Sequence, residues 1–202
     1  MNAHTEFIRK LVQENFKLFP CDDNNKPVLD IKNFQKGLKE FNEDLALWIH
    51  SPSFQINQNI AVLTGESSQL VVVDVDLEFR GTTVWKYLLK KYNETKDIDS
   101  LKITTPSGGY HYYFSFDKEK FHKFESIYRP TIQGFGKTGI DIIAENGYVM
   151  SPFTQRKDGG MYLPESYFAN LEIRKQINPI PEWLFLLFRN SREAMLNRIY
   201  RK

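Results

Sequence analysis

The stretch that decides the fold of this chain reads Gln69-Leu70-Val71-Val72-Val73-Asp74-Val75-Asp76. β-Branched residues favour strands, and an apolar run without polar alternation predicts a strand that is covered on both faces. Residues two apart in a strand point to the same side, so Asp74 and Asp76 should emerge together where the run ends. The stretch therefore predicts a buried strand that ends in two neighbouring carboxylates.

Helical and strand patterns intermix on both sides of this run. The apolar spacing predicts helices at residues 5–17, 31–40, 44–49, 82–91 and 181–200. Short β-branched or aromatic runs predict further strands at residues 17–20, 59–65, 101–105, 111–116, 140–144 and 148–151. This mixture predicts an α+β (mixed α/β) fold, with one mixed sheet favoured over a barrel.

Composition narrows the class of protein. The 202 residues carry 27 Lys+Arg against 25 Asp+Glu, so any contact with nucleic acid must come from a local basic strip. The single cysteine, Cys21, excludes a disulfide framework and a cysteine-based zinc site. We find neither a signal-peptide pattern nor an apolar run of the roughly 18 residues that span a bilayer, so we expect a cytoplasmic protein without membrane contact.

Three carboxylates are candidates for chemistry. Asp74 and Asp76 would repel each other unless one is protonated or a cation lies between them, and a hard divalent ion with oxygen ligands satisfies this need. The alternative is that one caps the following helix and the other is solvated. Asp141, in Gly139-Ile140-Asp141-Ile142-Ile143-Ala144, is costly to bury without a partner, which either a metal ion or a structural salt bridge would supply.

A glycine turn precedes the strand predicted at 111–116, in Thr105-Pro106-Ser107-Gly108-Gly109-Tyr110-His111. Consecutive glycines can free backbone N–H groups to form an anion-binding concavity. His111, directly after this turn, is a candidate phosphate contact, and an ordinary half-buried histidine is the alternative. The pattern favours an anion-binding turn at Gly108 and Gly109, and the position of His111 after this turn raises the odds that it contacts a phosphate.

The run Gly134-Phe135-Gly136-Lys137-Thr138 ends like a phosphate-binding P-loop. Thr131 stands where the opening glycine of that motif would be, and a strand rather than a helix is expected to follow. These departures argue against a P-loop NTPase and leave Lys137 as a plain cation that could meet phosphate.

Taken in order, these segments resemble the bifunctional DNA primase/polymerase (Prim-Pol) domain of the archaeo-eukaryotic primase superfamily. The signature of that superfamily is an apolar strand ending in Asp-x-Asp/Glu, a small-x-His segment opening a strand, and an apolar-Asp strand. Here these read Val73-Asp74-Val75-Asp76, Gly109-Tyr110-His111 and Ile140-Asp141. The segments 59–65, 146–152 and 179–184 also look like the Prim-Pol branch, so the resemblance covers roughly residues 7–190.

The resemblance implies an N-terminal α/β unit packed on an RRM-like sheet, with the active site in the cleft between them. Asp74, Asp76 and Asp141 would be catalytic and hold two Mg²⁺ or Mn²⁺ ions, without zinc. His111, the backbone of 107–109 and Lys137 would bind the triphosphate of a (d)NTP. Residues 1–190 would form the catalytic domain, and residues 191–202 a basic tail or linker.

These features predict a template-dependent nucleotidyltransferase that uses single-stranded DNA and a primer, as in plasmid or phage replication. Many members have an arginine soon after the third aspartate, where this chain has Ile142-Ile143-Ala144. We find no helicase motif, so a helicase would be a separate chain or a missing downstream module. The alternatives are a metal-dependent nuclease and a non-catalytic DNA-binding replication-initiator domain.

Overall fold

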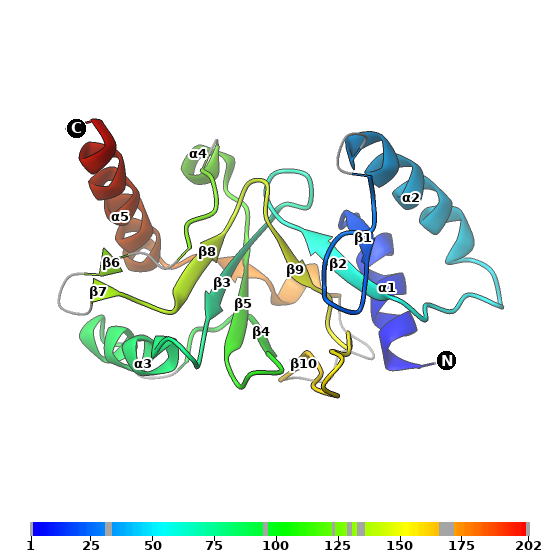
Figure 1. The fold of residues 1–202 in the computed structure, drawn as a ribbon, viewed down its shortest axis with the longest axis horizontal. Helices are drawn as coiled ribbons and strands as arrows, with labels where there is room; N and C mark the ends of the chain where they lie inside the picture. Colours follow the sequence, from blue (N-terminus) through cyan, green and yellow to red (C-terminus); the bar gives the residue numbers. More distant parts are fainter. Residues whose placement is uncertain are drawn as a thin grey trace.

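A computed structural model describes residues 2–30, 34–94, 97–122, 124–128, 131–132, 136–165 and 172–200. The fold is α+β, as the sequence predicts, and its described residues form a smaller sheet, a larger sheet and a two-stranded ladder rather than one mixed sheet (Figure 1). The prediction of a single sheet is wrong because the strands nearest the N-terminus pair with each other and with residues 148–150, and not with the run around Val72.

The smaller sheet belongs to the N-terminal unit and has the order β1-β2-β9. Its elements are α1 (Ala3–Gln13), β1 (Leu18–Cys21), α2 (Phe34–Trp48), β2 (Asn59–Leu63) and β9 (Tyr148–Met150). Pro20 is accommodated because β1 is an edge strand, where a missing N–H leaves no gap in the ladder.

The helices predicted at 31–40 and 44–49 form one helix, α2, and residues 31–33 lie outside the described residues. No proline or glycine interrupts residues 38–48, so nothing stops the helix between them. Asn42, in the middle, fastens α2 to the smaller sheet. Its side-chain oxygen accepts a hydrogen bond from Leu18 N and its amide donates to Leu18 O.

The larger sheet has the order β10-β4-β5-β3-β8, with β11 added in parallel to β5. Its elements are β3 (Leu70–Val75), α3 (Gly81–Lys91), β4 (Leu101–Thr104), β5 (Tyr110–Ser115), α4 (Lys118–Phe121), β8 (Ile140–Ile143), β10 (Leu163–Pro164) and β11 (Asn178–Pro179). The four strands β3, β4, β5 and β8 follow the β-α-β-β-α-β order of an RRM-like fold, with β3 and β5 in the centre.

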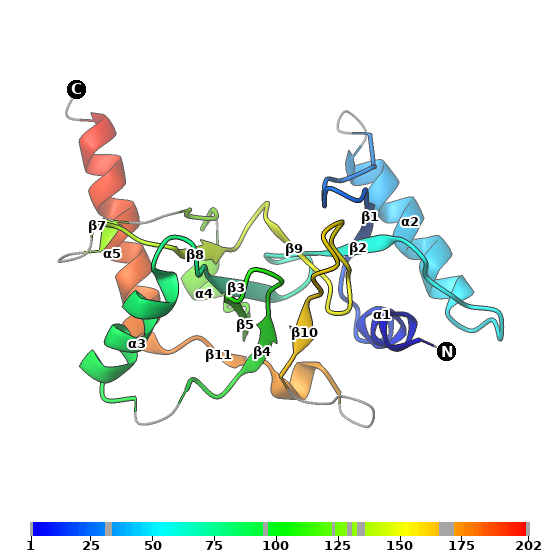
Figure 2. The ribbon, with the colours of Figure 1, turned by 60° about the horizontal axis from the view of Figure 1, so that its bottom comes forward.

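Alternation along β3 divides the apolar side chains between two cores. Leu70 and Val72 face the N-terminal unit and pack with Ile8 of α1 and Val62 of β2. Val71, Val73 and Val75 face the opposite side, where residues of α3 and of α5 (Glu182–Tyr200) cover the sheet. Figure 2 shows α3 and α5 together at the end of the molecule opposite α1 and α2. Because both faces are covered, β3 is a continuous apolar run.

Three small elements complete the chain: β6 (Thr131–Ile132), β7 (Gly136–Lys137) and the 3₁₀-helix Arg174–Gln176. Helix α5 runs across residue 190 without a break, up to Tyr200. None of the helices in the described residues combines the length and the apolar character needed to cross a bilayer.

Candidate active site

Asp74 lies in a row of side chains across the larger sheet. It is the register partner of His111 on β5 and of Asp141 on β8. Directly opposed residues of antiparallel strands have their side chains on the same face, so these three groups are neighbours. The face is the one that Val72 shares, and it packs against the N-terminal unit, as the cleft hypothesis requires.

Asp76 follows β3 and is held by its own turn. Its Oδ1 accepts a hydrogen bond from Glu78 N at 2.9 Å, and its backbone N donates to Gly139 O at 2.7 Å. This contact differs from the helix cap that the sequence suggested as the alternative to metal binding. Asp76 caps the turn over residues 76–80 and not the helix that begins at Gly81.

The surroundings of Asp74 and His111 favour the neutral forms of both side chains. Burial, together with the nearby Asp76 carboxylate, raises the pKa of Asp74 to about 7. Burial also lowers the pKa of His111 to about 4, although its Nε2 lies 3.6 Å from Asp74 Oδ1. Between these values both groups are neutral, so the contact is not an ion pair. A cation would stabilise the charged form of Asp74, which burial and the nearby Asp76 disfavour.

Three glycines allow the backbone to pack closely around the end of β3. A Cβ on Gly81 would lie 2.1 Å from Gly139 O and 2.4 Å from Asp76 O. A Cβ on Gly109 would lie 2.3 Å from Val75 O, and one on Gly139 would lie 2.8 Å from Phe79 Cβ. Any side chain at these positions would therefore displace the strand end that carries the aspartates.

The turn Thr105–Gly109 uses its own N–H groups. Gly108 N donates to Thr105 O at 2.9 Å, and Gly109 N donates to Thr105 Oγ1 at 3.0 Å. The expectation that these two N–H groups are free to bind an anion is therefore wrong for this conformation. Gly108 has a φ of +84°, which closes the hairpin between β4 and β5, and Ser107 at the tip is exposed.

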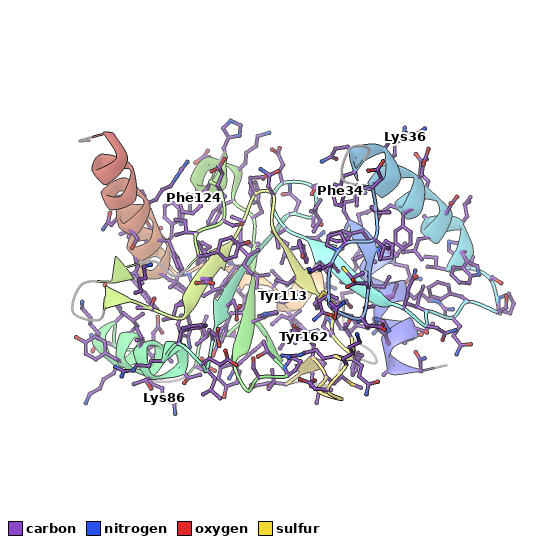
Figure 3. The ribbon with its side chains drawn as sticks, in the orientation of Figure 1. Phe34, Lys36, Lys86, Tyr113, Phe124 and Tyr162 are labelled. Carbon is purple, nitrogen blue, oxygen red and sulfur yellow. The ribbon has the colours of Figure 1, made fainter. Side chains whose placement is uncertain are left out.

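His111 is buried, with its side chain 8% exposed. Its Nδ1 has no hydrogen-bond partner among the described residues, and neither does the hydroxyl of Tyr113, two residues along the same face. Tyr162 covers this part of the face, with its ring centroid 5.6 Å from that of His111 (Figure 3). Burial, followed by the negative charge of Asp74, raises the pKa of Tyr162. Tyr162 thus joins the site from a segment that the sequence analysis left out.

Lys137 lies exposed on β7, two residues before Gly139. The segment after it is strand β8, not a helix, so the departure from a P-loop expected at this point is confirmed. Lys137 precedes Asp141 of β8 by four residues and is not one of the row of opposed residues.

The turn between Asp76 and α3 has two features that the sequence analysis missed. Leu77 and Phe79 are large apolar side chains with 49% and 39% of their surface exposed. Arg80 has a φ of +61°, a left-handed conformation that is costly for a residue with a side chain. Exposed apolar groups and local strain next to the carboxylates are typical of a functional loop.

The donor set suits a hard divalent ion, although it is not assembled around one. Within the described residues, no three His, Cys, Asp or Glu side chains are grouped so as to hold a metal ion. Asp76 accepts the hydrogen bond from Glu78 N through Oδ1. Burial and repulsion from Asp76 raise the pKa of Asp74, and a cation would offset both costs.

Residues 8–183 match the family described as bifunctional DNA primase/polymerase, N-terminal, and this chain belongs to that family. No curated protein matches the chain. Family membership supports a DNA primase/polymerase function, with DNA and nucleotides as substrates.

Proposed function

We propose that the protein is a template-dependent nucleotidyltransferase, which transfers a nucleotide from a (d)NTP to the 3′-hydroxyl of a primer and releases pyrophosphate. The observation that carries the proposal is the register of Asp74 opposite Asp141, with Asp76 two residues further along the chain. Such a pair of adjacent buried-face carboxylates is costly for stability and has the chemistry of a divalent metal site.

Asp74, Asp76 and Asp141 would hold two Mg²⁺ or Mn²⁺ ions. These ions would supply activation of the 3′-hydroxyl and neutralisation of the triphosphate charge. The carboxylates themselves would orient the reacting groups, since phosphoryl transfer depends mainly on positioning and electrostatic stabilisation. Zinc has no role in this proposal.

The neighbouring groups would bind the nucleotide. Ser107 offers an exposed hydroxyl at the tip of the β4–β5 turn, and Lys137 offers an exposed ammonium. Gly108 and Gly109 would contribute by shaping that turn against Val75 and Leu77. His111, whose Nε2 faces Asp74, would hold that carboxylate and meet the phosphates once the row is charged. A helicase on a separate chain remains a prediction.

Primer extension tests the proposal. The full chain is incubated with a labelled primer on a DNA template, with Mg²⁺ or Mn²⁺ and with ribo- or deoxynucleotides separately. A nucleotidyltransferase lengthens the primer only when nucleotide is present. Shortening regardless of nucleotide would indicate the nuclease alternative, and DNA binding without either reaction would indicate a replication-initiator domain.

A further inference from the structure

Helix α3 carries a concentration of positive charge that the fold does not use. Residues 79–93 contain Arg80, Lys86, Lys90 and Lys91 but no acidic residue, whereas the whole chain has a net charge of only +2. All four cations are exposed. The helix buries Val84, Trp85 and Leu88 against the larger sheet, so Lys86, Lys90 and the 48%-exposed Tyr87 lie on its outer face. Figure 3 shows Lys86 at the rim of the molecule.

These cations differ from most others in the structure. Lys36 and Lys39 on α2, for example, pair with Glu40 and Glu43 one turn later. Within the described residues, no ion pair involves Arg80, Lys86, Lys90 or Lys91, although the ammonium of Lys91 lies 5.5 Å from the ring centroid of Tyr92. The nearby Glu94 accepts a hydrogen bond from Trp183 Nε1 instead.

Helix stability does not explain the arrangement. Lys90 and Lys91 in the last turn interact favourably with the helix dipole, but Arg80 at the opposite end is unfavourable there and adopts a strained backbone. Lys86 and Lys90 are one turn apart, a spacing at which like charges repel. An unpaired cationic face that costs stability indicates a negatively charged partner.

The position of the helix identifies that partner. Its first residue, Gly81, lies against the backbone of Asp76, so α3 begins beside the end of β3, although the helix covers the sheet face opposite to the carboxylate row. Cations interleaved with an exposed aromatic residue are typical of single-strand binding, in which bases stack while lysines follow the phosphates. We infer that the outer face of α3 binds the phosphate backbone of the single-stranded DNA template where the template passes the end of β3. This inference rests on the proposed function.

The test is the salt dependence of binding to a fluorescent oligo(dT), measured by anisotropy with the full chain. Each phosphate contact on a single strand contributes about −0.7 to the slope of log K against log salt. The variant Lys86→Gln/Lys90→Gln/Lys91→Gln should flatten the slope by about 2 units and weaken binding at 0.1 M salt by roughly 10- to 100-fold. In primer extension, the template concentration that gives half the maximal rate should rise by a similar factor for this variant.

The matched control is Lys36→Gln/Lys39→Gln/Lys175→Gln, which removes the same charge from exposed, ion-paired lysines elsewhere. Figure 3 shows Lys36 and Lys86 at opposite corners of the molecule. This control should keep the wild-type slope. An equal loss in both variants, no loss in the α3 variant, a loss confined to duplex DNA, or no oligo(dT) binding by the wild type would each overturn the inference. If the α3 variant binds DNA like the wild type and primers are still extended, only this inference fails and the proposed function stands. If primers are not extended but the salt slope changes as expected, only the proposed function fails.

Discussion

The two halves of β3 differ in what they contribute to the molecule. Residues 70–73 have no exposed surface and join the two cores on either side of the larger sheet. From Asp74 onward come Asp74 itself, whose pKa is raised by burial and by the nearby Asp76, and a turn with exposed apolar side chains. The first half stabilises the fold, whereas the second half has groups placed where they cost stability. Such a cost, at the end of a rigid strand, is what a preorganised site requires.

The largest expected effect is loss of catalysis at the second half. Asp74→Asn keeps the shape of the side chain but removes the negative charge that the proposed ions need. Primer extension should fall by about 1,000-fold or more, while the circular dichroism spectrum stays unchanged. The control Asp99→Asn makes the same change at an exposed position and should extend at the wild-type rate. Equal rates for both variants would remove Asp74 from the mechanism.

The next effect concerns the packing around the strand end. Gly81→Ala would place a methyl group 2.1 Å from Gly139 O, so the backbone must shift, and we expect a loss of about 3 kcal/mol in the free energy of unfolding. Gly37→Ala in α2 meets only Leu29, at 3.6 Å, and should gain about 0.5–1 kcal/mol because alanine favours helices. Denaturant unfolding measures both. A neutral Gly81→Ala would mean that this packing is looser than described.

The first half of β3 should respond in stability alone. Val72→Ala removes buried methyl groups between Tyr113 and Ile143, its register partners, at a cost of about 2–3 kcal/mol. Val28→Ala, at a position 56% exposed, should change stability by less than about 0.5 kcal/mol. Extension per folded molecule should be unaffected in both variants. A specific catalytic defect in Val72→Ala would contradict the claim that the first half of β3 contributes to stability alone.

The smallest effect is the pH dependence of stability without divalent ions. The pKa of Asp74 is raised from 3.8 to about 7, so its contribution to stability is fully present below pH 4 and is lost as the pH rises through 7. Asp74→Asn should therefore be the more stable protein at pH 8, by about 2 kcal/mol after allowance for solvent screening, and the difference should vanish near pH 4. Melting curves across this range measure it, and a constant difference would contradict the raised pKa.

The two halves of β3 could be predicted from the sequence, because the unbroken valine run indicates a buried strand and the aspartates mark its end. The Prim-Pol resemblance implies that His111 and Asp141 lie near Asp74, but the residue pattern alone does not, because register depends on turns that close only in three dimensions. The contact of Gly81 with Gly139 joins residues 58 positions apart, and no local pattern signals it. Tyr162 lies in an irregular segment, where neither helical nor strand periodicity applies. The exposed Leu77 and Phe79 could have been noticed, since two large apolar residues in a polar turn after Asp-x-Asp are unusual.

The most direct test of the central claim is the melting temperature of the wild type and of Asp74→Asn/Asp76→Asn, each with and without Mn²⁺ at pH 8. A ligand that binds only the folded state raises its melting temperature. The account predicts that the wild type melts lower than the variant without ions and gains several degrees with Mn²⁺, whereas the variant does not respond. Two results would contradict the claim that the carboxylates at the end of β3 destabilise the fold and hold metal ions. One is an equal rise in the melting temperature of both proteins with Mn²⁺, and the other is a variant that melts below the ion-free wild type.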